Sequence, residues 1–188
     1  MSVLFVAALE EESAALAEHL DVHHLGVGKV QAAAALARAL ADRPGTELVV
    51  NLGTAGALAD LPVESVLPVG VVHQHDFDRA GVSAFVGRPM PGGPITLPGP
   101  TGATARLATG DRVVVDPAQR AALAADADLV DMEGYAVAAV CARFDVPAWL
   151  IKAVSDRADQ DAVTDWPTTV SRCAQHLAAW VDAHVPTG

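Results

Sequence analysis

The sequence is poor in several residue types, and each shortage argues against a class of protein. Its two cysteines, Cys141 and Cys173, are too few for a disulfide framework, and both lie in helix-like segments, which predicts free buried thiols. It contains 12 Lys and Arg and 23 Asp and Glu, which gives a net charge of −11. Because phosphate groups are bound through Lys and Arg, this charge disfavours nucleic acid and anionic membranes as partners and favours a neutral or cationic small molecule.

Long apolar runs are also lacking. The longest, such as residues 134–142, fall short of the roughly 20 residues that span a bilayer, and no basic flank precedes the first apolar stretch. We therefore expect a cytoplasmic protein. A length of 188 residues with 52% hydrophobic content predicts a single domain over residues 1–188 whose core is covered on both faces.

Strand-like and helix-like segments alternate along the chain. Continuous apolar runs, each leading into polar or glycine-rich residues, predict doubly buried strands at residues 3–8, 47–51 and 148–154. Helical patterns cover residues 29–42, 134–144 and 166–184. This alternation predicts an α/β layered fold with a ligand site at the carboxyl ends of the strands.

The middle of the chain departs from this pattern. Residues 79–105 are crowded with proline and glycine and predict a long loop, which would serve as a lid or an oligomer contact or would be disordered. Just before it, His73 and His75 alternate on a strand-like segment beside Asp76. No second cluster completes a ligand set, so we predict no metal site.

Three acidic residues follow the predicted strands or begin a helix: Glu12, Glu133 and Asp156. The fold class suggests that they converge over the strand ends. Each also has a purely structural interpretation, since acids favour the first turn of a helix and aspartate is a common N-cap.

Several short segments around these acids resemble methylthioadenosine/S-adenosylhomocysteine nucleosidases. They are residues 8–12 (ALEEE), 26–30 (GVGKV), 51–56 (NLGTAG), 130–134 (VDMEG) and 148–159, which include SDRAD. These segments occur in the family's order and span most of the chain outside the Pro/Gly-rich region. The resemblance implies a three-layer α/β/α fold with a central mixed sheet, trimmed because the connection from Glu12 to Gly26 is too short for two extra strands. No metal or organic cofactor is implied.

The resemblance assigns a role to each acid in cleaving a purine N-glycosidic bond. Asp156 would protonate N7 of the departing base, which requires burial to favour its protonated form. Glu12 would orient and deprotonate the attacking water. Glu133 would accept hydrogen bonds from the ribose 2′- and 3′-hydroxyls and favour the cationic sugar.

Further substrate contacts follow from the same resemblance. Met132 would lie along the sugar face, and Ser155 would steady the Asp156 loop. The other implied contacts are Thr54, Ala55 and Gly56 near the nucleophile, Val113 and Val114 beside the base, Trp166 against the 5′ substituent, and Lys152 near Glu12. Phe85 resembles an aromatic that reaches a neighbouring subunit's site in dimeric relatives. A tryptophan in an amphipathic helix also serves simply as core, and that alternative stays open for Trp166. A homodimer is implied.

Two positions favour water over phosphate as the nucleophile. Asn51 stands where related hexameric phosphorylases have a phosphate-binding arginine, and the first-strand loop carries Glu12 in place of a Gly- and Arg-containing cradle. Two other positions depart from the nucleosidase pattern: Lys152 replaces an arginine, which removes a bidentate contact, and Val113 replaces a phenylalanine that stacks on adenine.

The sequence therefore predicts a purine nucleoside N-ribohydrolase that acts on adenosine-type compounds with a modified 5′ position. Futalosine hydrolase and phosphate-dependent nucleoside phosphorylase are alternatives within the family. A nucleoside-binding sensor without turnover is the alternative from another class, motivated by Lys152, Val113 and the deletions.

Overall fold

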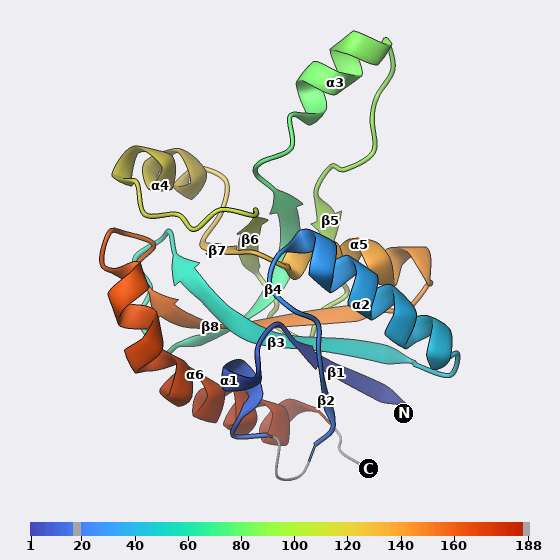
Figure 1. Cartoon of the computed structure of the whole chain (residues 1–188), viewed down its shortest axis with the longest axis vertical. Coiled ribbons are helices and arrows are strands. Elements are labelled where there is room, and N and C mark those ends of the chain that lie inside the picture. The colour runs from blue at the N-terminus through green and yellow to red at the C-terminus, as the bar shows by residue number, and fades with distance from the viewer. Residues whose placement is uncertain (17–19, 186–188) are drawn as a thin grey trace.

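A mixed β-sheet forms the centre of the protein, shown in Figure 1 as a computed structural model that describes residues 1–16 and 20–185. The strands are β1 (Val3–Ala7), β2 (Val22–His24), β3 (Leu48–Ala57), β4 (Val66–Gln74), β5 (Ile95–Thr96), β6 (Ala105–Thr109), β7 (Leu129–Asp131) and β8 (Ala148–Asp156). Strand β3 runs parallel to β1 and β8, so the three long predicted strands end at the same edge of the sheet. Polar residues that follow or end these strands therefore meet there.

The sheet closes on itself. Strand β8 pairs with β3 on one side and antiparallel with β4 on the other, while β6 and β7 link β4 back to β3. Strands β1 and β2 extend the sheet beyond this ring. Closure gives β8 a paired strand on each side, and its last seven residues, 150–156, are all buried, as is Ala148.

Helices cover both faces of the sheet (Figure 1). Helices α2 (Lys29–Asp42) and α5 (Gly134–Arg143) pack together on one face, while α1 (Glu10–Ser13) and α6 (Ala162–His184) pack together on the other. Each helix contributes a buried stripe, represented by Leu36 of α2 and Leu177 of α6. The predicted α/β fold, with helices on both sides of a mixed sheet, is confirmed. No helix among the described residues is long and apolar enough to cross a membrane.

The Pro/Gly-rich region is more regular than predicted. It contains helix α3 (Arg79–Val86) and the short strand β5, and α3 projects away from the rest of the molecule (Figure 1). Asp78 caps α3 by accepting a hydrogen bond from the Gly81 amide at 2.8 Å, and Gly87 ends it with a φ of 70°. The prediction of a loop over 79–105 was wrong because these local caps stabilise a helix that buries no residue.

Two other boundaries differ from the predictions. The strand predicted over residues 47–51 continues as β3 to Ala57. Helix α6 begins at Ala162, because amides of residues 164 and 165 bond to the Asp161 carbonyl and so complete a turn before Pro167. The helix therefore starts four residues earlier than predicted.

Candidate active site

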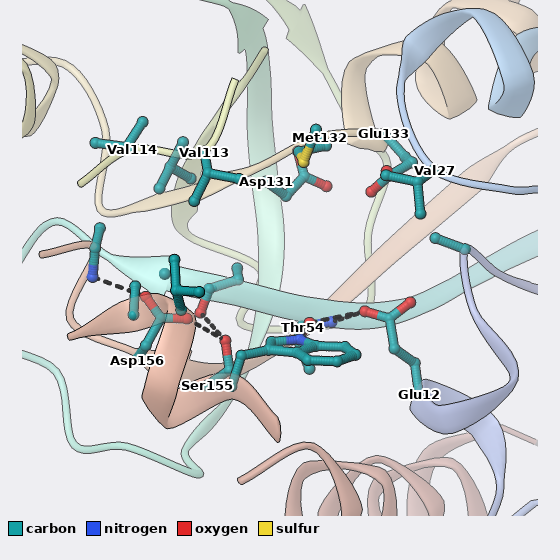
Figure 2. Close-up of a pocket in the computed structure, with 18 of the residues that line it drawn as sticks. Glu12, Val27, Thr54, Val113, Val114, Asp131, Met132, Glu133, Ser155 and Asp156 are labelled. Carbon is teal, nitrogen blue, oxygen red and sulfur yellow. Dashed lines mark hydrogen bonds between the residues drawn. The ribbon is translucent and has the colours of Figure 1, made fainter. Parts of the chain in front are cut away.

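A pocket of about 360 Å³ opens where β1, β3 and β8 end. Its size suits a small ligand. Figure 2 shows Glu12, Thr54, Ser155 and Asp156 along one wall, with Glu133, Met132, Val113 and Val114 facing them. Predicted site residues that line the pocket are Glu12, Thr54, Ala55, Gly56, Val113, Val114, Met132, Glu133, Ser155, Asp156 and Trp166.

Glu12 is held at one end of this wall by its hydrogen bonds. Its Oε1 accepts from the Thr54 amide at 2.7 Å and from the Thr54 hydroxyl at 2.8 Å, while Oε2 accepts from the Leu9 amide at 3.2 Å. The side chain is buried, although α1 would allow it to point into solvent. Since each carboxylate oxygen accepts two or more hydrogen bonds, Oε2 keeps capacity for a further donor such as water.

The approach of Glu12 to β3 depends on a missing side chain. A Cβ added at Gly53 would lie 3.1 Å from Lys152 Nζ and 3.3 Å from Glu12 Oε1. Glycine at this strand position therefore leaves room for both charged groups behind the pocket wall.

Asp156, the last residue of β8, is anchored at the other end of the wall (Figure 2). Its Oδ2 accepts from the Ser155 hydroxyl at 2.6 Å, and its Oδ1 accepts from the Ala158 amide at 2.8 Å. A Cβ at Gly56 would lie 2.9 Å from Oδ1, so this glycine also makes room for a carboxyl group. The result is a buried carboxyl of fixed orientation that faces the pocket.

Glu133 faces these two acids from the start of α5. Its Oε1 accepts a hydrogen bond from the Gly28 amide at 2.7 Å. Burial raises the pKa of Glu133 to about 7, and the Asp131 carboxylate adds to this rise, while the Lys152 ammonium and the Gly28 amide oppose it. Glu133 therefore changes charge near neutral pH.

This pKa predicts how stability depends on pH. An unfolded chain ionises Glu133 near its ordinary value of 4.5, whereas the folded chain keeps the proton up to about 7. Between these values the unfolded state binds fewer protons, so the contribution of Glu133 to stability is present below pH 4.5 and is lost as pH rises through about 7. Relative to Glu133→Gln, the wild type should lose free energy of unfolding over this window in urea titrations. The matched variant of the exposed Glu10, Glu10→Gln, should follow the wild type, and parallel profiles for wild type and Glu133→Gln would contradict the assignment.

Lys152 does not line the pocket, contrary to the prediction of a substrate contact. Its side chain is 2% exposed and its Nζ lies 2.9 Å from Asp131 Oδ2. Burial alone would lower the pKa of Lys152, but the carboxylates of Asp131, Glu12 and Glu133 outweigh burial and raise it. Lys152 is thus a buried cation between the acids, because closure of the sheet turns its side chain inward.

Phe85 also lies outside the pocket. It belongs to the projecting helix α3 and is 92% exposed. Within one chain it contacts none of the site, because α3 carries it away from the carboxyl edge of the sheet.

Aliphatic residues form most of the remaining wall. Val114 is buried and Val113 is 59% exposed, and Trp166 donates from Nε1 to Thr54 Oγ1 at 2.9 Å. The pocket is also lined by residues for which no role was predicted: Ala8, Leu9, Val27, Arg112, Val130, Asp131, Ala158, Ala162 and Val163. Asp131 precedes the Met132-Glu133 pair, and its adjacency to two residues with assigned roles was the one signal available for it.

The sequence also missed a polar connection at the pocket rim. Lys29 forms an ion pair with Asp76, and the Lys29 amide donates to Asp111 Oδ1 at 2.8 Å. The Asp111 amide in turn donates to Asp76 Oδ2 at 2.9 Å. These contacts join the start of α2, which holds Glu133 through Gly28, to the segment that carries Val113. Among the described residues, no group of three His, Cys, Asp or Glu side chains could hold a metal ion.

Comparison with known proteins shows two similarities. A model of the Phosphorylase superfamily matches residues 97–185. The 5′-methylthioadenosine/S-adenosylhomocysteine nucleosidase of Shewanella sediminis is 27% identical over 199 residues, which cover 95% of this chain and 86% of that protein. The chain is thus similar to the Phosphorylase superfamily over its second half and to this nucleosidase over nearly its whole length.

Solved structures share the fold of this chain across its length. A Helicobacter pylori 5′-methylthioadenosine/S-adenosylhomocysteine nucleosidase in complex with butyl-thio-DADMe-Immucillin-A superposes with a TM-score of 0.85 at 22% identity, covering 97% of both chains. Futalosine hydrolase of H. pylori superposes with a TM-score of 0.84 at 23% identity, covering 97% of this chain and 96% of the other. The chain therefore has the fold of these structures.

Proposed function

We propose that this protein is a nucleosidase that hydrolyses the N-glycosidic bond of adenosine-type nucleosides with a modified 5′ position, as methylthioadenosine and adenosylhomocysteine are. The observation that carries the proposal is the arrangement of three buried carboxyl groups around one pocket, with Asp156 and Glu12 at opposite ends of one wall and Glu133 facing them. The similarity to curated nucleosidases over 95% of the chain supports it.

Bond cleavage begins at the base. Asp156 donates its proton to N7 of the purine while the electron pair of the glycosidic bond moves onto the base, which leaves as a neutral molecule. The Ser155 hydroxyl and the Ala158 amide fix the orientation of the Asp156 carboxyl during this step. Met132 lies along the sugar and Val113 and Val114 flank the base.

Water completes the reaction at the sugar. Cleavage leaves positive charge on the ribosyl group, which ionised Glu133 stabilises while accepting hydrogen bonds from the 2′- and 3′-hydroxyls. A water held by Glu12 adds through its oxygen to C1′, and Glu12 takes the proton. Thr54, Ala55 and Gly56 form the wall beside this water.

Water is favoured over phosphate by the residues near the nucleophile. Asn51 is 2% exposed, and its amide donates to carbonyls within the sheet at 3.4 Å, so it faces away from the pocket. Among described lining residues, Arg112 carries the only full positive charge, and it is exposed. A dianion would meet three carboxyl groups in this pocket without a bidentate arginine.

Futalosine hydrolase is the second candidate. It is favoured by Val113, which is 59% exposed and covers the base less completely than an aromatic ring, and by the similar fold of the H. pylori enzyme. Free base released from methylthioadenosine, adenosylhomocysteine, adenosine, inosine and futalosine, each with and without phosphate, distinguishes the candidates by chromatography. We expect phosphate-independent release, greatest with a 5′-modified adenosine. Release only with phosphate would overturn hydrolysis, and binding without release would identify a sensor.

We further propose a cytoplasmic homodimer. In it the projecting helix α3 would carry the exposed Phe85 to the pocket of the second chain, which accounts for a phenylalanine that is 92% exposed. Light scattering should return twice the chain mass of 19.3 kDa, and a monomer would exclude this arrangement.

A further inference from the structure

Three side chains from separate elements form a continuous hydrogen-bonded chain along the wall of the pocket. Trp166 of α6 donates from Nε1 to the Thr54 hydroxyl at 2.9 Å, and that hydroxyl lies 2.8 Å from Glu12 Oε1. Thr54 belongs to β3 and Glu12 to α1. Trp166 is half-buried and also lines the pocket.

The chemistry of these groups fixes the direction of the chain. An indole N–H only donates, so the Thr54 oxygen must accept from Trp166. The hydroxyl has one proton, which is then directed to Glu12, and Oε1 accepts it as a carboxylate oxygen. The Thr54 amide donates to the same Oε1 at 2.7 Å. Both donors therefore fix the position of Oε1 and leave Oε2 to receive a proton from water.

We propose that Trp166 is a positioning residue for the nucleophile: its indole N–H orients the Thr54 hydroxyl, which in turn holds Glu12 aligned as general base. The inference rests on the proposed hydrolysis. It gives Trp166 a task that a phenylalanine of similar shape lacks, because only the indole carries a donor.

Other groups around Glu12 stay in place when Trp166 changes. The charged and titratable residues that interact electrostatically with Glu12 are Lys152 of β8, Glu133 at the start of α5, and Cys173 of α6. None of them is hydrogen-bonded to Trp166. A loss of kcat in a Trp166 variant that is absent in a Thr54→Val background therefore reports on the chain through Thr54.

Trp166→Phe tests the proposal, since it keeps an aromatic ring and removes the N–H donor together with the second ring of the indole. We expect kcat for base release to fall about threefold to tenfold, as for one lost hydrogen bond, with KM changed less than about twofold. Trp180→Phe, the same change in the same helix where Trp180 stacks on His184, should leave kcat and KM unchanged.

A double-mutant cycle and a spectroscopic measurement complete the test. In a Thr54→Val background, Trp166→Phe should cause no further loss of kcat. In ¹⁵N-labelled protein, the Trp166 indole N–H signal, identified by its absence from Trp166→Phe, should move in Glu12→Gln, which alters the acceptor of the Thr54 hydroxyl, and stay in place in Glu10→Gln. This second readout needs no turnover, so it tests the chain even if wild type releases no base and the proposed hydrolysis fails. Turnover with an unchanged kcat in Trp166→Phe, or a change in KM alone, would overturn the positioning role and leave hydrolysis intact.

Discussion

Asp156→Asn is expected to lower kcat for base release by about a thousandfold, the range typical of a lost general acid. Asparagine has the shape of aspartate, and its oxygen can still accept from the Ala158 amide, so the anchoring of the side chain persists. What it lacks is an acidic proton for the departing base. The loss should therefore appear in kcat, while nucleoside binding in calorimetry should change little.

Asp159→Asn serves as the matched control for this prediction. Asp159 lies three residues further along, outside the pocket, where its Oδ1 caps the Asp161 amide at 3.0 Å. Its variant should retain kcat within about twofold, as expected for a surface change without a role in the chemistry. Comparable thermal unfolding of both variants would show that Asp156→Asn is folded. If Asp156→Asn kept more than a tenth of wild-type kcat, another group would have to protonate the base.

Lys152→Met is expected to lower the free energy of unfolding by about 3–5 kcal/mol, the effect of breaking a buried ion pair by removing one partner. The variant leaves Asp131 charged and buried, with bonds only from the Thr109 hydroxyl at 2.6 Å and the Gly134 amide at 2.8 Å. The same cation also faces Glu12 and Glu133, so three carboxyl groups lose their common counter-charge. Urea unfolding measures the loss.

Arg38→Met provides the comparison for Lys152→Met. Arg38 pairs with Asp42 at 3.8 Å on the surface of α2, where both side chains are exposed. Removing that pair should change stability by about 0.5 kcal/mol or less, since exposed pairs are weak. The loss of unfolding free energy in Lys152→Met should be several times larger than the loss in Arg38→Met. Equal small losses would mean that water reaches Asp131 or that Asp131 takes up a proton readily.

Local patterns predicted the elements that carry the site. Helix α2 begins and ends at the residues predicted, 29 and 42, because a run of alanine and leucine is interrupted by Arg43-Pro44-Gly45. Strands β1 and β8 lie on two of the continuous apolar runs that predicted strands. Such features depend on neighbours in sequence, so composition and periodicity reveal them.

Local patterns failed where distant segments decide the structure. The segment 53–56 contains two glycines, which favour a turn in isolation, yet pairing with β8 keeps it in strand β3. The glycines serve there to admit Lys152, Glu12 and Asp156, side chains from other elements. No window of sequence around residue 53 contains that information.

The sequence by itself determined which chemical groups are available: three carboxyl groups beside strand ends, an alternation of strands and helices, and no arginine at position 51. The tertiary structure alone decided their environment. Closure of the sheet between β8 and β4 buries Lys152 against Asp131. The projecting helix α3 holds Phe85 outside the pocket. The physical reason is that burial, charge pairing and the pKa of Glu133 depend on distances between residues far apart in the chain, and these distances exist only once the sheet has closed.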